Sequence, residues 1–360
     1  MNIKIHSSEL NRMLKTVTQC ISPKDIGKLS NIEIICDNNL LTIRGSDGHF
    51  SAVMSTPMLG SDGEVFCVDG AMFAKVCAMC NGEITITTDG KFCTVKGAGR
   101  TRLPIVDAKL PAYEHVNGQT VTVPAEEFAK AYAGVQHAIA SDMANRIQLT
   151  GVNFETRTDH VGKWVNMTAL DGFQMSIEHA DCEGDDMKVI IPGAFMKLIV
   201  QSTVAGETIK IRTDGKRIEA LTDGMMLNCG LLGGEYPDVE RILPKDFKTK
   251  CLVNAELLRN ALKSGSVVNV KQNLVKIEIS ADGMKVMNNS EEADYEAEVP
   301  CEMQGEPLKI AFNQKYLMNT INSLDNGEIE MEFGTSVSPC IAHGKGEQGI
   351  RLILPVRVMG

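Results

Sequence analysis

The groups best suited to covalent chemistry in this 360-residue chain are its eleven cysteines. Only Cys77 and Cys80 have the Cys-x-x-Cys spacing that zinc sites and redox centres use, and no second pair of ligands accompanies them. They fall late in a stretch rich in Ala, Met and Phe, where cysteines usually pack as small apolar side chains. We therefore predict no metal site and no cofactor. Scattered reduced thiols indicate a cytoplasmic protein.

Aspartates followed by glycine recur along the chain and could suggest a catalytic carboxylate site. Asp-Gly is, however, a favoured turn between two strands. The chain also has no Walker A pattern, no His-Glu-x-x-His and no Gly-x-Ser-x-Gly. We predict that it is not an enzyme; the alternative left open is a repeat-built cytosolic enzyme that uses Cys77 or a carboxylate pair. The turns begin at Asp47, Asp62, Asp89, Asp171, Asp214, Asp223 and Asp282.

Cationic side chains recur on every predicted helix and could bind phosphates. The formal net charge of −10 argues against a protein that binds nucleic acid over its whole surface, but not against a basic lining on one face. Lysine on a solvated helix face is the commoner explanation when no repeat is considered. The helices offer no aromatic platform for stacking bases, which disfavours single-strand binding. The helix cations that would face DNA, if the chain binds it through one basic face, are Arg12, Lys15, Lys75, Lys130, Lys197, Arg259, Lys263 and Lys315.

The elements that carry these residues occur as three copies of one unit. Each copy opens with a short apolar strand, a polar helix start with an acid in the first turn, and an amphipathic helix. Alternating strands follow, and then a second helix that stops at a Gly-Glu pair before another alternating strand. The opening strands are at residues 3–5, 121–123 and 251–253, and the Gly-Glu pairs are at 82–83, 206–207 and 327–328.

Two helices and many strands per copy predict an α+β fold of three repeated domains, each with two helices on antiparallel sheets. The repeats place the domains at residues 1–118, 119–245 and 246–360. Lys4, His6 and Glu9 interrupt the N-terminal segment, so we expect no signal peptide. No apolar run is long enough to span a bilayer, and no membrane partner is expected.

Residues 233–244 form a connector near the second boundary. Pro237 and Pro244 rule out a continuous helix or a central strand, and two glycines precede them. Val239, Ile242 and Leu243 are apolar, so we interpret the connector as a junction with buried anchor points that also contributes to a binding surface. A plain linker is the simpler alternative, which these residues alone do not exclude.

Several motifs, in this order and spacing, resemble the bacterial DNA polymerase III beta subunit, the sliding clamp family, over essentially the whole chain. They are residues 169–172, 236–238, 241–244, 312–313 and 354–358. The resemblance implies a head-to-tail dimeric ring that encircles double-stranded DNA without sequence preference. It also implies partners: the DNA polymerase catalytic subunit, the clamp loader and other proteins that carry clamp-binding peptides. A scaffold that never meets DNA remains a further alternative.

The same resemblance implies two interaction sites. In the closed ring, an edge strand that contains Leu103 and Ile105 would pair with a second copy of the chain. Leu103 and Ile105 would lie on one face of that strand and contact Val267 and Val268 of the second copy. Family members often have a basic residue where Phe173 and Gln174 stand, which bears on peptide preference. The peptide-binding groove would use Leu149, Leu170, Gly172, Met175, Pro237, Arg241, Ile242, Leu354, Pro355, Val356 and Arg357.

Overall fold

The computed structural model describes residues 2–23, 28–60, 63–142, 145–268, 273–324 and 327–357. The chain forms two compact units of comparable size. Unit 1 contains Met1–Phe128 and Cys182–Leu231, and unit 2 contains Ala129–Asp181 and Leu232–Gly360. Both units draw on the predicted central domain, so the three-domain division stays a prediction.

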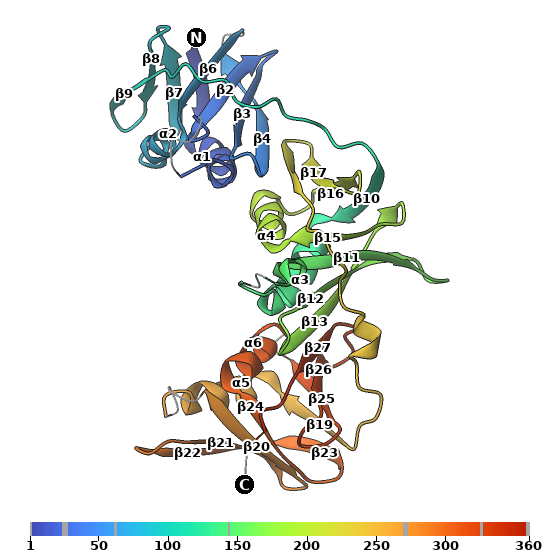
Figure 1. The fold of residues 1–360 in the computed structure, drawn as a ribbon. Helices are drawn as coiled ribbons and strands as arrows, with labels where there is room; N and C mark the ends of the chain where they lie inside the picture. The colour runs from blue at the N-terminus through green and yellow to red at the C-terminus, as the bar shows by residue number, and fades with distance from the viewer. Residues whose placement is uncertain are drawn as a thin grey trace. The chain divides into compact units, whose positions relative to one another are not determined.

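Unit 1 is built on two antiparallel sheets. One has the strand order β5-β1-β7-β8-β9 and the other β14-β10-β16-β17-β18-β4-β3-β2-β6. Helices α1 and α2 pack side by side, as Figure 1 shows. The elements are β1 (Asn2–His6), α1 (Ser7–Val17), β2 (Asn31–Asp37), β3 (Leu40–Ser46), β4 (Phe50–Pro57), β5 (Leu59–Gly60), β6 (Glu64–Asp69), α2 (Gly70–Ala78), β7 (Glu83–Thr88), β8 (Phe92–Lys96), β9 (Arg100–Pro104), β10 (Gln119–Pro124), β14 (Glu183–Gly184), β15 (Lys188–Pro192), α4 (Gly193–Ser202), β16 (Thr208–Thr213), β17 (Arg217–Thr222) and β18 (Met225–Gly230).

Unit 2 has the same construction. One series of paired strands runs β11-β12-β13-β27-β26-β25-β19-β23, and a four-stranded sheet has the order β22-β21-β20-β24. Helices α5 and α6 pack together over a shared apolar core (Figure 1). The elements are α3 (Ala125–Val135, which starts at the end of unit 1), β11 (Gly151–Thr158), β12 (Lys163–Leu170), β13 (Gln174–Asp181), η4 (Val239–Arg241), β19 (Thr249–Asn254), α5 (Ala255–Gly265), β20 (Leu274–Ser280), β21 (Gly283–Asn289), β22 (Asp294–Val299), β23 (Cys301–Gly305), β24 (Leu308–Asn313), α6 (Gln314–Asn322), β25 (Glu328–Phe333), β26 (Cys340–Gly344) and β27 (Ile350–Ile353).

Three helix starts follow the predicted capping rule; α1 and α4 do not, and the Pro192 N-cap of α4 makes no side-chain hydrogen bond. Asp69, Asn254 and Asn313 are the N-caps of α2, α5 and α6, and each side chain accepts hydrogen bonds from first-turn N–H groups. The N-cap of α1 is His6, whose side chain accepts from the Ser8 N–H, so Ser7 lies inside the helix. The α+β fold and all six predicted helices are confirmed.

The Asp-Gly pairs serve as turns. Four of the aspartates accept two backbone N–H bonds each from the residues two and three positions later, which closes the hairpin. These bonds hold the pKa of Asp89 and Asp214 below the usual range. A carboxylate committed to its own turn is not available as a catalytic group. The four are Asp47, Asp89, Asp171 and Asp214; Asp62 lies outside the described residues.

Candidate functional site

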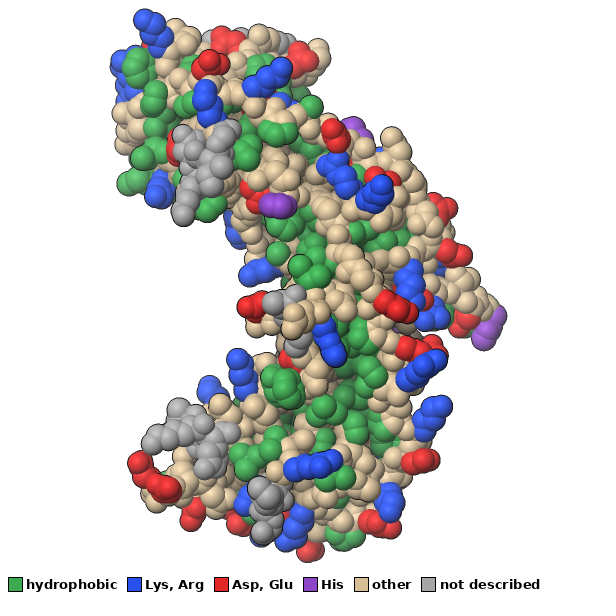
Figure 2. Space-filling view, in the orientation of Figure 1, with side chains coloured by type: hydrophobic (Ala, Val, Ile, Leu, Met, Phe, Trp, Pro, Cys, Tyr) green, Lys and Arg blue, Asp and Glu red, His purple; other side chains and the backbone are tan. Residues whose placement is uncertain are grey.

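A compact apolar cluster in unit 2, here called the apolar patch, gathers several of the predicted peptide-site residues. Its buried members come from loops, from β12 and β13, and from β27. Four partly buried side chains pack against them. Figure 2 shows hydrophobic side chains gathered over the region where Figure 1 draws β13, β27 and β26. The buried members are Ala140, Leu149, Leu170, Met175, Ile177 and Leu352, and the flanking ones are Tyr236, Val239, Leu243 and Ile350.

Strand register brings the patch together. β13 pairs with β12 on one side, with Leu170 opposite Met175, and with β27 on the other, with Met175 opposite Leu352. Directly opposed residues of an antiparallel pair lie on the same face. The β12–β13 turn contains Gly172 at φ +94, a conformation that glycine adopts without strain. The sequence analysis missed Ile177 and Leu352; Ile177 lies between polar Ser176 and Glu178, and that alternation was a usable signal.

Exposed apolar side chains lie at the ends of the segments that build the patch. Ile242, Leu354 and Val356 are 39%, 37% and 39% exposed. Phe173 is 56% exposed and stacks on Tyr316 with ring centroids 5.6 Å apart. The Leu354 N–H donates to the Phe173 carbonyl at 2.9 Å, which ties the C-terminal segment to the β12–β13 turn. These residues form a rim that partner side chains can reach, while Leu149, Leu170 and Met175 form a buried floor.

The connector 233–244 packs against the patch, but not through all the predicted anchors. Val239 and Leu243 do pack there. Ile242 is exposed, so its prediction as a buried anchor was wrong, because the short 3-10 turn η4 directs it outward. Tyr236, which we had not singled out as an anchor, packs against the patch instead. Arg241 pairs with Asp238 at 3.0 Å, yet its side chain stays 86% exposed.

Beneath the patch, on the other face of β13 and β27, lies the buried side chain of Arg351. Its exposure is 1%. It forms an ion pair with Glu178 and donates to the Ser323 hydroxyl at 2.8 Å and the Ser323 carbonyl at 3.1 Å. It also reaches the Ile177 carbonyl. One guanidinium therefore links β27, β13 and the end of α6.

The end of α3 is fastened to the same strands. The Ser176 hydroxyl donates to the Gly134 carbonyl at 2.7 Å, and the Gln174 amide donates to the His137 carbonyl at 2.9 Å. A Cβ on Gly134 would lie 2.5 Å from Glu178, so no side chain fits there. Burial, with a contribution from Arg351, lowers the pKa of His137 to about 4. This histidine is therefore a neutral packing residue at pH 7.

The candidate DNA-facing cations separate into two groups. Arg12 pairs with Glu9 at 2.7 Å, and Arg259 donates to Asn322 at 2.9 Å and to the Ile321 carbonyl at 3.1 Å, so both are engaged within the chain. The other six are exposed, and none forms an ion pair with another residue in the described ranges. They fall one to a helix: Lys15, Lys75, Lys130, Lys197, Lys263 and Lys315 on α1 to α6.

The predicted ring-closing residues are only partly where we expected them. β9 is an edge strand, as predicted. Leu103, however, is only 8% exposed, and Ile105 follows the strand end, so the two do not form one exposed apolar face. Val267 is 77% exposed, but it and Val268 lie in the turn after α5 rather than in a strand. β22 is one of the two edge strands of the four-stranded sheet in unit 2, and β24 is the other.

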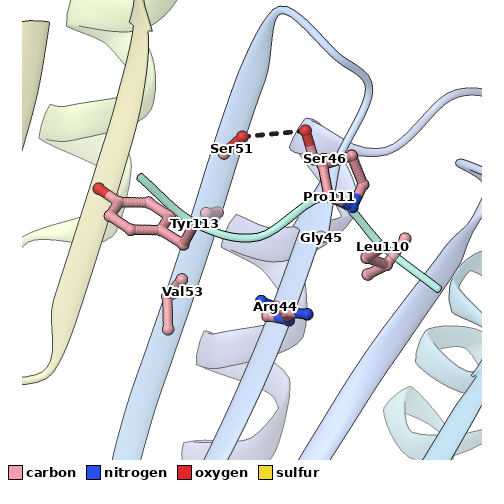
Figure 3. A pocket seen from close by; sticks show the side chains of 9 residues that line it. Arg44, Gly45, Ser46, Ser51, Val53, Leu110, Pro111 and Tyr113 are labelled. Atoms are coloured by element: carbon pink, nitrogen blue, oxygen red, sulfur yellow. Dashed lines mark hydrogen bonds between the residues drawn. The ribbon is translucent and has the colours of Figure 1, made fainter. Parts of the chain in front are cut away.

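Two hollows in the described parts of the chain are too small for an ordinary ligand. One in unit 1, where Leu110, Pro111 and Tyr113 cross the sheet beside Ser46 and Ser51, encloses about 10 Å³ (Figure 3). One in unit 2 beside β19 and β23 encloses about 180 Å³. Small-molecule pockets usually measure about 300–1,000 Å³. Within the described ranges, no group of three or more metal-ligating side chains could hold an ion, and no helix is long and apolar enough to cross a membrane.

Models of the DNA polymerase III beta subunit match two adjacent parts of this chain. The central-domain model matches residues 122–238 and the C-terminal-domain model residues 240–357. The chain belongs to the DNA polymerase III beta subunit family. The beta sliding clamp of Staphylococcus epidermidis is 24% identical over 371 residues, covering 97% of this chain and 96% of that protein. The Bacillus subtilis beta sliding clamp is 22% identical over 384 residues, covering 99% and 100%.

Solved structures support the same fold. The crystal structure of the DNA polymerase III beta subunit from Thermotoga maritima has a TM-score of 0.90 to this chain at 23% identity, covering 99% of this chain and 100% of that one. The resemblance recognised in the sequence motifs and the clamp fold are thus confirmed. The beta subunit family is one of sliding clamps, not of enzymes. The enzyme alternative also lacks a nucleophile at Cys77, which is fully buried and whose pKa burial raises to about 12.

We predict that Arg351→Met lowers the free energy of unfolding of unit 2 by about 3–5 kcal/mol, because Glu178 is left as an uncompensated, largely buried charge. Urea denaturation followed by fluorescence of Trp164, the single tryptophan, reports on this unit. The control Lys345→Met removes an exposed ion pair to Glu328 and should leave the urea midpoint close to that of the native chain. Equal urea midpoints for Arg351→Met and the native chain would contradict the prediction.

Proposed function

We propose that this chain works as a DNA sliding clamp: a head-to-tail homodimeric ring of six repeated domains that encircles double-stranded DNA and tethers the replicative polymerase. The observation that carries the proposal is the set of six exposed lysines, one on each of the six repeated helices. Lysine binds phosphate as a point charge and reads no base sequence. A repeated fold that offers one such contact per helix suits sequence-independent binding.

Ring closure is proposed between two edge strands, β9 of one copy and β22 of the other. β9 has Arg100 and Arg102 exposed along its edge. In β22 the exposed acids alternate with less exposed residues. The acids are Asp294, Glu296 and Glu298. Opposite charges facing each other favour this pairing and disfavour pairing of either edge with itself. Joining two edges also covers the unpaired backbone groups that would otherwise promote aggregation.

We expect Arg100→Glu with Arg102→Glu to produce monomers at concentrations where the native chain is a dimer, because acidic edges then face each other. Sedimentation velocity measures the mass. A chain that also carries Glu296→Arg and Glu298→Arg should dimerise again, since the charges are complementary once more. A β9 variant that remains as dimeric as the native chain would sink this placement of the interface.

The experiment that tests the function is retention on DNA. Lys75→Glu, Lys197→Glu and Lys263→Glu, combined in one chain, should shorten residence on nicked circular duplex by about tenfold or more at moderate salt, because three phosphate contacts per subunit are reversed. Linearising the circle should release even the native protein. The matched control is Lys96→Glu, Lys210→Glu and Lys276→Glu, which changes the net charge equally on exposed strand positions.

Two outcomes would count against the clamp. One is that the strand-lysine control loses retention as strongly as the helix-lysine variant. The other is a sequence-selective footprint, or affinity for short linear duplex that does not fall with salt. A native chain that dimerises but never remains on circular DNA would favour the alternative of a scaffold that does not meet DNA.

The apolar patch and its rim are proposed as the docking site for short linear peptides of the polymerase, the clamp loader and other clamp-binding proteins. Apolar anchor side chains of a peptide would contact the exposed rim residues Ile242, Leu354 and Val356, which lie around the buried floor. Methionine suits a site with several partners because its side chain repacks easily. Pro237 and Pro355 restrict the flanking backbone, so little entropy is lost on binding. Arg241 and Arg357 are exposed and can bind acidic or carbonyl groups of the peptide.

We predict that Leu354→Asp lowers the affinity for a fluorescein-labelled peptide from the clamp-binding segment of the polymerase catalytic subunit by at least about tenfold, because a carboxylate replaces an apolar rim contact. Fluorescence anisotropy measures the binding. Val337→Asp is the matched control: it introduces the same charge at another exposed apolar residue of unit 2 and should leave affinity unchanged. Deletion of residues 354–360 should abolish binding; unchanged affinity in either rim variant would place the site elsewhere.

A further inference from the structure

Two cysteines face each other at the edge of a sheet in unit 2. Cys301 is the first residue of β23, and Cys251 lies in β19. The register places Val253 opposite Cys301 and Cys251 opposite Met303. Side chains two residues apart along a strand share a face, so the two thiols are diagonal neighbours on one side of the sheet. A hydrogen bond joins the two side chains.

Exposure distinguishes Cys301 from the other cysteines. All eleven lie within the described residues and are free thiols. Ten of them are buried, and Cys301 is half-buried. Cys251 is only 3% exposed and belongs to the core of the unit, with Cys301 packed against that core from outside. A small oxidant can therefore reach Cys301 from solvent, whereas Cys251 is buried in the core next to it.

The hydrogen bond also separates the acidities of the two thiols. Accepting it lowers the pKa of Cys301, because the thiolate form gains a donor. The same bond, together with burial, raises the pKa of Cys251. Burial raises the pKa of Cys77 and Cys93 to about 12, which keeps them protonated and unreactive. The Cys77/Cys80 spacing noticed in the sequence is therefore not the reactive pair.

We infer that Cys301 and Cys251 form a peroxide-sensitive dithiol, in which Cys301 is the attacking thiolate and Cys251 the resolving thiol. The Cys301 sulfur attacks one peroxide oxygen, the O–O bond breaks, and the leaving hydroxide takes a proton to become water. Cys301 is thereby oxidised to the sulfenic acid and the peroxide is reduced. The Cys251 sulfur then attacks the Cys301 sulfur, the S–O bond breaks, and a second water leaves with the Cys251 proton. The net change is two thiols and one peroxide converted to one disulfide and two waters.

The position in the sheet allows this closure. Diagonal residues on neighbouring strands have Cα atoms about 7–8 Å apart, slightly farther than a disulfide spans. To close the disulfide, β23 must move slightly toward Cys251. It can do so because it is an edge strand that pairs only with β19 in its sheet. Cys301 is the first residue of β23 and follows Pro300. Because proline has no backbone N–H, movement at Pro300 breaks no hydrogen bond that proline donates between strands. Formation of the disulfide would fasten β23 to β19.

Mass spectrometry of the full-length protein tests the inference. Graded hydrogen peroxide, alkylation of the remaining thiols and tryptic digestion without reduction should give a cross-linked pair of peptides, 251–259 and 286–309, each with a single cysteine. Cys301 should be alkylated about tenfold faster than the buried thiols in the untreated protein. In Cys251→Ser, peroxide should instead leave a Cys301 sulfenic acid that dimedone traps. Cys340→Ser, which removes a nearby buried thiol, should still form the cross-link.

Two results would overturn the inference. The first is an absence of both the cross-linked peptides in the native protein and the dimedone adduct in Cys251→Ser. The second is peroxide-dependent loss of other thiols at the same rate as Cys301, which would mean that oxidation follows unfolding. Circular dichroism of each variant before peroxide confirms that the compared chains are folded.

Discussion

Unit 2 depends on one buried charge. Taking the Arg351 guanidinium out of water costs several kcal/mol, which only close ionic and carbonyl partners can offset. Glu178 and the carbonyls of Ile177 and Ser323 supply them, and in doing so they fix β27 against β13 and against the end of α6. Strand alternation then places Leu352 on the opposite face, where the apolar patch lies. The buried ion pair thus sets the geometry of the apolar patch, the proposed docking surface, from the other face of the sheet.

The same charge limits the surrounding sequence. A Cβ on Gly349 would lie 2.5 Å from a Glu178 oxygen, as close as the one on Gly134. Both positions must stay without side chains for the ion pair to fit. His137 packs nearby in its neutral form, because burial and, to a lesser extent, the neighbouring charge of Arg351 lower its pKa. A rigid floor built in this way loses little conformational entropy when a peptide binds.

Features governed by local chemistry could be predicted from the sequence. Asn254 and Asn313 cap helices because a side-chain oxygen replaces the missing intrahelical acceptor, and that rule needs only neighbouring residues. The Asp-Gly turns and the alternating strands follow equally local rules. The repeats and terminal motifs were enough to recognise the family. They also located part of the apolar patch, because Leu170 and Met175 lie within or beside the motif at residues 169–172.

What could not be predicted depends on contacts between distant residues. Ile242 and Tyr236 are both apolar enough to be anchors, and only the path of the connector decides that Tyr236 packs inward. Leu103 looked exposed from its edge strand, but its own unit buries it. The ion pair of Arg351 with Glu178 joins residues 173 positions apart, and neither has a local signal of burial. Sheet order likewise decides that β22 and β24, not the turn after α5, are the edges of that sheet.

The distribution of charge explains how a chain with a negative net charge can make weak contacts to DNA phosphates. Glu9, Glu126 and Glu256 lie in first helical turns, where they stabilise the helix dipole and contribute to the net charge of −10. The six exposed lysines are the groups that we propose bind phosphate on the same helices. Each is a flexible point charge whose single contact is weak and screened by salt. A ring that must move along DNA needs contacts of this kind, because retention comes from encirclement and tight bidentate phosphate binding would oppose sliding.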